Sequence, residues 1–304
     1  MPIKSFSLLI LVTVLMSDAK NDLRLNCSEN LDTSGFVNEL LYADDTLLID
    51  THGGVVQQYM DSVVKRGGEY GLQIHWKKVE ILPIKCTPRI STTSGEYIEC
   101  KSSISYLGAL LDTSGSIQSE LARRIGMATA DFKALSRIWN HTSVTKELKY
   151  RIYQACIVSK LLYGLQVAWL TKTQRVRLDG FHARCVRKIV GVPHSFWSRI
   201  SNADVLEKIH ARPLSLQLLE QQLLLFGKIF RRPDEDIMRQ MVFNPGCETL
   251  RTSRIGRARG RPRLSWSTEV YKQATLLNHG SDSFGMLMAD AGEWGARVRA
   301  FCSN

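Results

Sequence analysis

Residues 40–49 read LLYADDTLLI, and this pattern decides the fold expected around it. Apolar residues stand on both sides of Ala43-Asp44-Asp45, which predicts two short strands joined by a tight polar turn. Two adjacent carboxylates repel each other unless a bound cation offsets their charge. Mg²⁺ is such a cation, because it is commonly bound by carboxylates together with substrate phosphates. The pattern predicts a metal-binding hairpin; the alternative is a polar turn whose aspartates serve only the turn.

The sequence around this hairpin mixes helix and strand signals. Apolar residues at helical spacing predict a helix over residues 53–64, with Gly67-Gly68 at its end. Looser alternation over residues 73–76 and 79–82 predicts an edge strand, and residues 95–100 are expected to pair with residues 105–111 as a hairpin. This part of the chain is therefore expected to be α+β.

Beyond Gly115 the pattern becomes helical. Four helices are expected, marked by Leu121, Ile125, Phe132, Leu135 and Ile138; by Leu148, Ile152, Ala155 and Ser159; by Val176, Phe181, Cys185 and Ile189; and by a leucine-rich run over residues 214–230 before Pro233. Residues 251–263 contain six arginines among 13 residues, interrupted by glycine and proline. That stretch predicts a flexible basic arm.

Charge is unevenly distributed along the chain. Residues 1–113 carry 10 Lys and Arg against 14 Asp and Glu, a net of −4, and residues 114–304 carry 30 against 15, a net of +15. A hydrophobic content of 44% excludes wholesale disorder. The basic second part is typical of a protein that binds a polyanion, nucleic acid first, although a merely solvated basic surface has the same composition.

Four blocks, in the same order, resemble the reverse transcriptases of non-LTR (LINE-type) retrotransposons. YADD at 42–45 resembles their catalytic hairpin, and GLQI at 71–74 with Lys77-Lys78 resembles the element after their palm helix. SYLG at 105–108 resembles the primer-grip hairpin, and KLLYG at 160–164 resembles a block of the thumb. The tail RGRPRLSW at 259–266 is also similar to a stretch near the ends of such sequences.

The resemblance implies an α+β fold: a partial palm of antiparallel strands and helices, followed by an all-α thumb and extension. The expected domains are residues 1–113 (partial palm), 114–240 (helical thumb and extension) and 241–304 (basic arm and C-terminal helical segment). The implied activity is RNA-directed DNA polymerisation, with an RNA template and a DNA primer as partners and Mg²⁺ or Mn²⁺ as cofactor.

Site residues follow from the same blocks. Asp44 and Asp45 are implied as the catalytic, metal-binding pair. Contacts with nucleotide or primer are implied for Tyr42, Lys78, Tyr106 and Gly108; the alternatives are an exposed lysine for Lys78 and a core aromatic for Tyr106. Phosphate contacts are expected from the tail arginines Arg257, Arg259, Arg261 and Arg263, because arginine pairs with two phosphate oxygens at once. Their alternative is a solvated charge run.

The family's third metal-binding aspartate is not among these residues. In the family it lies on a strand before the apolar helix, whereas the first acidic residue here, Asp18, lies after it. Loss of a metal ligand is expected to reduce catalysis by orders of magnitude, so the 304 residues are expected to be inactive alone. Activity would be expected if another chain supplied the missing half of the palm, or if the protein formed a homo-oligomer. The alternative function is a non-catalytic nucleic-acid-binding remnant.

The first 20 residues have the layout of a secretory signal peptide, with Lys4, an apolar run over 6–16 and Ser17-Asp18-Ala19. The run is too short to span a bilayer, and no membrane partner is expected. The resemblance instead implies a buried helix of the palm, so an intracellular protein of nucleus or cytoplasm is favoured.

Seven cysteines without any C-x-x-C pair argue against a disulfide framework and against a structural zinc site. His182 and Cys185 share one helix face at a spacing of three residues, but two ligands make a weak zinc site, and an ordinary half-buried pair is the favoured interpretation.

Overall fold

The computed structural model of the protein describes residues 2–26, 39–43, 45–251, 265–278 and 284–303. Within it the chain divides into two compact units, Met1–Gly115 and Ser116–Asn304. The boundary falls where the sequence pattern changes from mixed helix and strand to helix alone.

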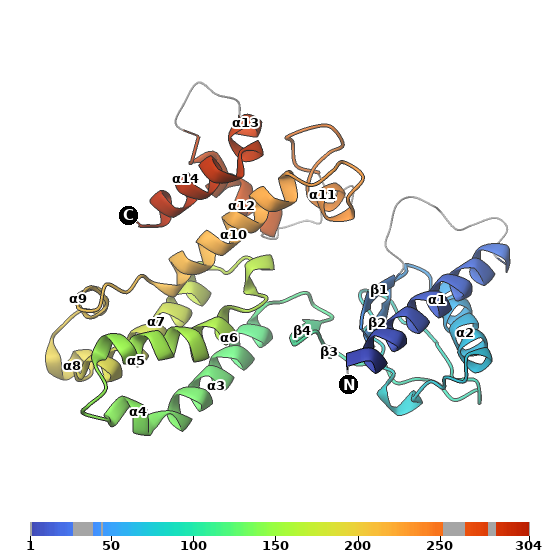
Figure 1. The fold of residues 1–304 in the computed structure, drawn as a ribbon, viewed down its shortest axis with the longest axis horizontal. Helices are drawn as coiled ribbons and strands as arrows, with labels where there is room; N and C mark the ends of the chain where they lie inside the picture. Colours follow the sequence, from blue (N-terminus) through green and yellow to red (C-terminus); the bar gives the residue numbers. More distant parts are fainter. Residues whose placement is uncertain (1, 27–38, 44, 252–264, 279–283, 304) are drawn as a thin grey trace. The chain divides into compact units, whose positions relative to one another are not determined.

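The first unit is built on two helices that lie side by side, α1 (Pro2–Asn26) and α2 (Gly53–Glu69) (Figure 1). Their core contains Leu15, Met16, Ala19 and Leu23 of α1 and Tyr59 of α2, all buried. The helix expected over residues 53–64 is confirmed. It continues through Gly67-Gly68, the end predicted for it, because the turn comes only at Gly71, whose φ of 72° is left-handed.

Polar contacts also join these helices. Asp22 of α1 accepts two hydrogen bonds from the Arg66 guanidinium, Nε to Oδ2 at 2.7 Å and Nη2 to Oδ1 at 2.5 Å. The Tyr70 hydroxyl donates to Asp18 Oδ2 at 2.7 Å. The apolar run over residues 6–16 thus belongs to a helix that continues to Asn26 and packs on α2 through Leu15 and Met16. The expected burial is only partial, because four apolar residues of the run are 42–51% exposed: Leu8, Leu9, Ile10 and Val14. No helix in the described ranges is both long enough and apolar enough to cross a bilayer.

Two small antiparallel sheets complete the first unit. The expected hairpin at YADD is confirmed: β1 (Glu39–Tyr42) pairs with β2 (Asp45–Leu48). The second hairpin differs from the predicted one, because β3 (Ser103–Tyr106) and β4 (Ala109–Asp112) pair with each other and both overlap residues 105–111, which were expected to form a single strand. Leu107 and Gly108 have φ values of 47° and 77°, which suit a two-residue turn between twisted strands.

The predicted edge strand over residues 73–82 is wrong. Trp76–Lys78 forms a 3₁₀ helix, η1, in which the Lys78 N–H donates to the His75 carbonyl at 2.8 Å. Residues 95–100 make only isolated bridges, Ser91 with Tyr97 and Ile81 with Cys100. Pro83 and Pro88 lie between residues 82 and 95 and lack an N–H group, so a continuous ladder of strand hydrogen bonds cannot run through residues 73–100.

The second unit is helical. Its α-helices are α3 (Gln118–Ala134), α4 (Ser136–Asn140), α5 (Lys146–Tyr153), α6 (Ser159–Leu162), α7 (Lys172–Val190), α8 (Ser195–Ser198), α9 (Asn202–Glu207), α10 (Leu214–Phe230), α11 (Ile237–Val242), α12 (Trp266–Thr275), α13 (Phe284–Ala289) and α14 (Ala291–Ser303). A π-helical segment, η2 (Gln154–Val158), connects α5 to α6, and a 3₁₀ helix, η3 (Leu165–Val167), follows α6.

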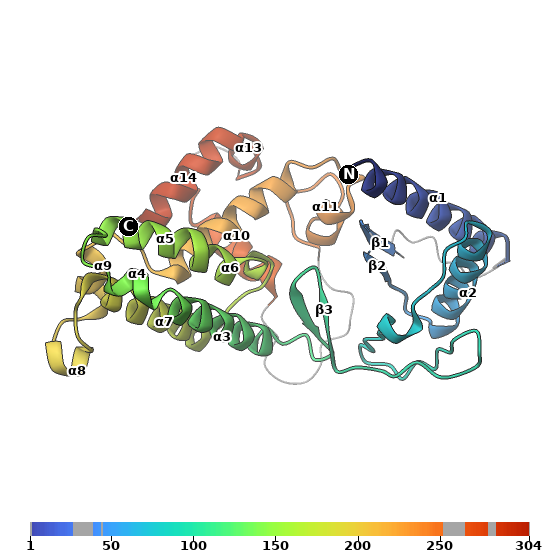
Figure 2. The same ribbon diagram turned by 60° about the horizontal axis from the view of Figure 1, so that its bottom comes forward.

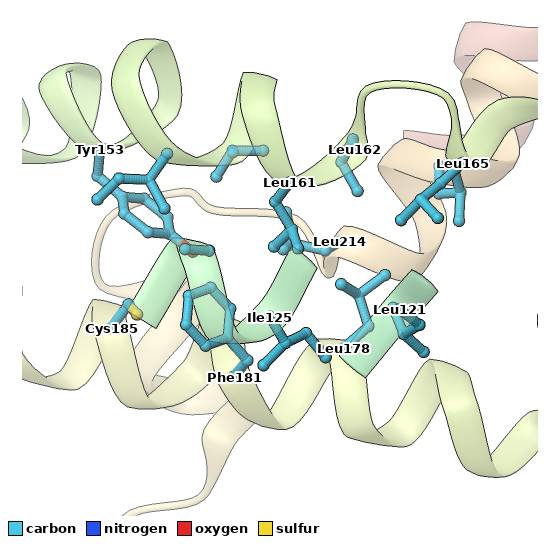
Figure 3. Close-up of a cluster of buried hydrophobic side chains, with 14 of the residues drawn as sticks. Leu121, Ile125, Tyr153, Leu161, Leu162, Leu165, Leu178, Phe181, Cys185 and Leu214 are labelled. Atoms are coloured by element: carbon cyan, nitrogen blue, oxygen red, sulfur yellow. The ribbon is translucent and has the colours of Figure 1, made fainter. Parts of the chain in front are cut away.

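Helices α3, α5, α6, α7 and the start of α10 enclose one core, in which Tyr153 and Leu161 point toward Phe181 and Cys185 of α7 (Figure 3). The second expected helix is present as α5, η2 and α6, and Ile152 packs against this core. Its other marker residues do not: Leu148 is 47% exposed, whereas Tyr153, Ile157 and Leu161 are buried.

Helix α10 belongs to two cores. Leu214 and Leu218 pack with α7, and Leu223 and Phe226 pack with the C-terminal helices α12–α14 (Figure 2). The predicted bounds of this helix are confirmed. The described C-terminal helices therefore lie in the same compact unit as the rest of residues 116–304.

Candidate catalytic hairpin and basic surface

The YADD hairpin ends at Tyr42 and Asp45, which pair across the last rung of the ladder, and Ala43 stands in the turn after Tyr42. Ala43 has a φ of 55°, a left-handed conformation that costs a residue with a Cβ on the order of 1 kcal/mol or more. Asp44 lies outside the described residues, whereas Asp45 is exposed and the Tyr42 side chain is 63% exposed.

The far end of the hairpin is attached to the helices. Lys20 Nζ of α1 is 3.0 Å from Glu39 Oε1 of β1, and Leu48 of β2 packs against the α1–α2 core. The apolar side chains of Leu40, Leu41 and Ile49 remain between 37% and 44% exposed. The hairpin is thus held at its base, and its carboxylate end faces solvent.

Tyr106 ends β3 of the second hairpin. Burial, and after it the negative charge of Asp45, raise the pKa of the Tyr106 hydroxyl above its ordinary value. Two site residues expected from separate blocks of sequence therefore lie within electrostatic reach of each other. Gly108 stands in the turn next to Tyr106, where its φ of 77° is easily adopted by glycine.

Lys78 is placed differently from this pair. It ends η1 and is exposed, and in the described part of the chain no hydrogen bond or ion pair joins it to Asp45 or Tyr106. The arginines Arg257, Arg259, Arg261 and Arg263 lie outside the described residues.

The donor set at the hairpin suits a hard divalent cation. Mg²⁺ prefers oxygen ligands and is often bound by one or two carboxylates, with substrate phosphates and waters completing its shell. Asp45 offers an exposed carboxylate at the hairpin turn, and Asp44 is its neighbour in sequence. Among described residues no group of three or more His, Cys, Asp or Glu side chains could hold a metal ion without a substrate.

His182 and Cys185 are core residues rather than a half-buried pair. His182 is fully buried, and its Nδ1 lies 3.0 Å from the Tyr153 hydroxyl. Burial lowers the pKa of His182 to about 4 and raises the pKa of Cys185 to about 12. Both side chains are therefore neutral at pH 7 and serve the packing of α7 against α5.

A basic row lies on the solvent face of α7. Arg177, Arg184 and Lys188 are exposed, and their spacing of seven and four residues places them on one side of the helix. None of the three takes part in an ion pair within the described residues, in contrast to Arg124, which pairs with Glu120. Unpaired cations in a row are suited to a polyanion. The sequence indicated the basic half but not this row.

Comparison with known proteins gives one similarity. The chain is 24% identical over 283 residues to an uncharacterized transposon-derived protein of Caenorhabditis elegans, and the match covers 88% of this chain and 97% of that protein. No family model matches the chain, and no solved structure matches it. The chain is thus similar, almost from end to end of that relative, to a protein that derives from a transposon.

Proposed function

We propose that this chain is part of the reverse transcriptase of a non-LTR retrotransposon, an RNA-directed DNA polymerase in which the YADD carboxylates act in phosphoryl transfer. The supporting observation is that the charge of Asp45 contributes to the raised pKa of the Tyr106 hydroxyl, so a residue of the YADD hairpin lies within electrostatic reach of the hairpin that resembles a primer grip. Similarity to a transposon-derived protein agrees with an origin in a mobile element.

Asp44 and Asp45 would hold Mg²⁺ or Mn²⁺ in this site, and such an ion, when bound, stabilises the negative charge that develops on the transferred phosphate. The protein itself contributes by positioning the reacting groups. The hairpin holds Asp45 at a turn, and the Tyr42 ring beside it is exposed for contact with a nucleotide or primer. Gly108 allows a backbone to approach closely, because it has no side chain.

The 304 residues contain two of the three carboxylates that the resemblance implies. We expect them to hold a divalent ion weakly and to extend a primer on an RNA template far more slowly than a polymerase with all three ligands. The metal site can nevertheless be tested in the chain as it stands, without any polymerisation.

The test replaces Mg²⁺ by Fe²⁺, which with ascorbate and hydrogen peroxide cleaves the backbone near the place where it binds. We expect cleavage within the hairpin around residues 42–48 and near Tyr106, suppressed by excess Mg²⁺ and lost in Asp44→Asn and Asp45→Asn. Asp61→Asn is the matched control, because Asp61 is an exposed aspartate of α2. Cleavage elsewhere, or cleavage that survives both hairpin variants, would overturn the proposal.

A second function is favoured by the basic row of α7. An unpaired row of Arg177, Arg184 and Lys188 suits a nucleic-acid-binding remnant without catalysis. A primer-extension assay with Mg²⁺ or Mn²⁺, run beside a binding assay, separates the two functions. Extension that is lost in Asp44→Ala identifies the polymerase, and binding without extension or Fe²⁺ cleavage identifies the remnant.

A further inference from the structure

The short helix α8 displays two large aromatic side chains to solvent. Trp197 is 78% exposed, more than any other large apolar side chain of the described residues, and Phe196 is 61% exposed. Their rings meet edge to face with centroids 5.0 Å apart, and the Arg199 guanidinium lies 5.6 Å from the centre of the Phe196 ring. Exposed aromatic rings gain nothing from folding, so their display requires another reason.

Hydrogen bonds from Arg187 of α7 hold the turn that carries these rings. Its guanidinium is buried and donates to the carbonyls of Pro193 at 3.0 Å and Ile200 at 2.7 Å. It also donates twice to Asn202 Oδ1, at 3.2 and 3.0 Å. Both ends of the turn are therefore tied to one side chain. The aromatic pair stands on an ordered support, which lowers the entropy cost of binding a ligand there.

The surroundings of the turn are cationic. No aspartate or glutamate occurs between Asp179 and Asp204, whereas Arg184, Lys188 and Arg199 in this interval are exposed. Arg184 and Lys188 follow each other by one turn of α7, about 6 Å along its axis. Figures 1 and 2 show α8 at one end of the helical unit, next to the end of α7. The basic row therefore runs toward the aromatic turn.

We infer that Phe196, Trp197 and Arg199, with Arg184 and Lys188, form a binding site for single-stranded nucleic acid. A base stacks on the indole of Trp197, and the phosphates of the same strand contact the two cations of α7. Such a combination of stacking rings and a basic track is the common design of single-strand binding surfaces, because every base offers an aromatic face. A protein partner would also use tryptophan and arginine, but the interval between Asp179 and Asp204 contains cations and no acidic residue, which favours a polyanion.

This inference deepens the proposed function, because it gives an unpaired strand a place on the second unit. It does not depend on the carboxylates of the YADD hairpin. A failure of the Fe²⁺ cleavage test therefore leaves this site open to its own test, and a failure of the binding test below leaves the metal site open to its own.

The test measures the anisotropy of a fluorescein-labelled oligodeoxyuridylate, and of an oligouridylate of equal length, at several salt concentrations. Trp197→Ala is expected to weaken binding roughly 5- to 150-fold without changing the dependence on salt, since stacking carries no charge. Arg184→Ala and Lys188→Ala are each expected to lower the slope of log affinity against log salt by about 0.7. A difference between the two oligonucleotides would show whether a 2′-hydroxyl is read.

The matched control is Tyr97→Ala, since Tyr97 is an aromatic residue of the first unit that is 72% exposed. It is expected to bind as the wild type does, and Trp197→Phe, which keeps a stacking face, is expected to bind between the wild type and Trp197→Ala. Circular dichroism checks that each variant is folded. Equal binding by Trp197→Ala and Tyr97→Ala overturns the inference, as does a change confined to the oligomeric state, which would assign the turn to a protein interface.

Discussion

The carboxylate of Asp45 acts on the hydroxyl of Tyr106, although the two residues belong to different hairpins of the first unit. Burial is the larger cause of the raised pKa of Tyr106, and the charge of Asp45 is the second. An anion disfavours the formation of a phenolate beside it, so the effect requires that the two groups are near each other. Tyr106 immediately precedes the turn at Leu107-Gly108, and Asp45 is the first residue of β2, so each hairpin carries its member of the pair at its turn end.

The first prediction follows from this pair. Asp45→Asn removes the charge and is expected to lower the pKa of Tyr106 toward its ordinary value, while the part due to burial remains. The measurement is a pH titration of ¹³C-labelled tyrosine by NMR, with Tyr106→Phe to assign the signal. Asp61→Asn is expected to leave that pKa unchanged, and an unchanged pKa in Asp45→Asn would show that the hairpins are apart.

The second prediction concerns the buried His182. Its pKa is about 4 in the folded chain, because burial disfavours the imidazolium, against 6.5 for an unperturbed histidine. The unfolded chain therefore binds the extra proton first as pH falls. The free energy of unfolding of the second unit is expected to fall from pH 6.5 to about 4, by an amount on the order of 3 kcal/mol, and the loss is complete below that range.

Urea unfolding at a series of pH values measures this effect. His182→Gln is expected to be less stable at pH 7, because the amide replaces an aromatic ring that stacks on Tyr153 with centroids 5.6 Å apart. Its stability is expected to depend less on pH between 6.5 and 4 than that of the wild type. His141→Gln, a change at an exposed histidine, is the control. Equal pH dependence in His182→Gln and the wild type would contradict the prediction.

Local sequence signals were sufficient where they were unambiguous. The YADD hairpin was predictable because apolar strands flank a short polar turn, and α10 was predictable because its leucine-rich run stands between Pro213 and Pro233. The second hairpin was placed wrongly because the run from Tyr106 to Leu111 is apolar throughout, so the turn at Gly108 was not recognised.

Tertiary relationships could not be read from the sequence. The residue types of the candidate site were predicted, but the nearness of Asp45 to Tyr106 depends on how the hairpins pack. The aromatic turn of α8 was missed, although two adjacent aromatic residues in an interval without acids, bounded by Gly191 and the capping residue Ser201, are a signal that could have found it.

The third prediction concerns the attachment of α1 to α2. A hydrogen bond from Arg66 holds the pKa of Asp22 below its ordinary value of 3.8. A carboxyl with a lowered pKa in the folded chain contributes stability above pH 3.8 and loses it as pH falls through the folded value. Asp22→Asn is therefore expected to speed proteolysis within α1 at pH 7, and its difference from the wild type is expected to shrink below about pH 4.

Proteolysis is followed by mass spectrometry, with an acid-active protease at low pH. Glu80→Gln is the matched control, because Glu80 forms an ion pair with Lys101 in the same unit that does not involve α1. Equal cleavage rates for Asp22→Asn and the control at pH 7 would show that the apolar core around Leu15 and Met16 holds α1 without help from the ion pair.

The fourth prediction tests the contact between α10 and α14. Gly227 stands against the indole of Trp294, and a Cβ at this position would lie 2.6 Å from Trp294 Cδ1. Trp294 is fully buried, and its Nε1 donates to the Leu223 carbonyl at 3.0 Å, so the ring cannot move without losing that bond. Gly227→Ala is therefore expected to destabilise the second unit by about 1–3 kcal/mol, although alanine favours a helix.

Gly126→Ala provides the matched control for this substitution. Gly126 lies within α3, and a Cβ there would meet no atom within 4 Å. The same chemical change is expected to stabilise the unit by about 1 kcal/mol at this position, because only the helix preference remains. Urea unfolding of both variants gives the two signs directly. If Gly227→Ala were as stable as Gly126→Ala, the C-terminal helix would not pack on α10 through Trp294, since close packing leaves no room for an added methyl group.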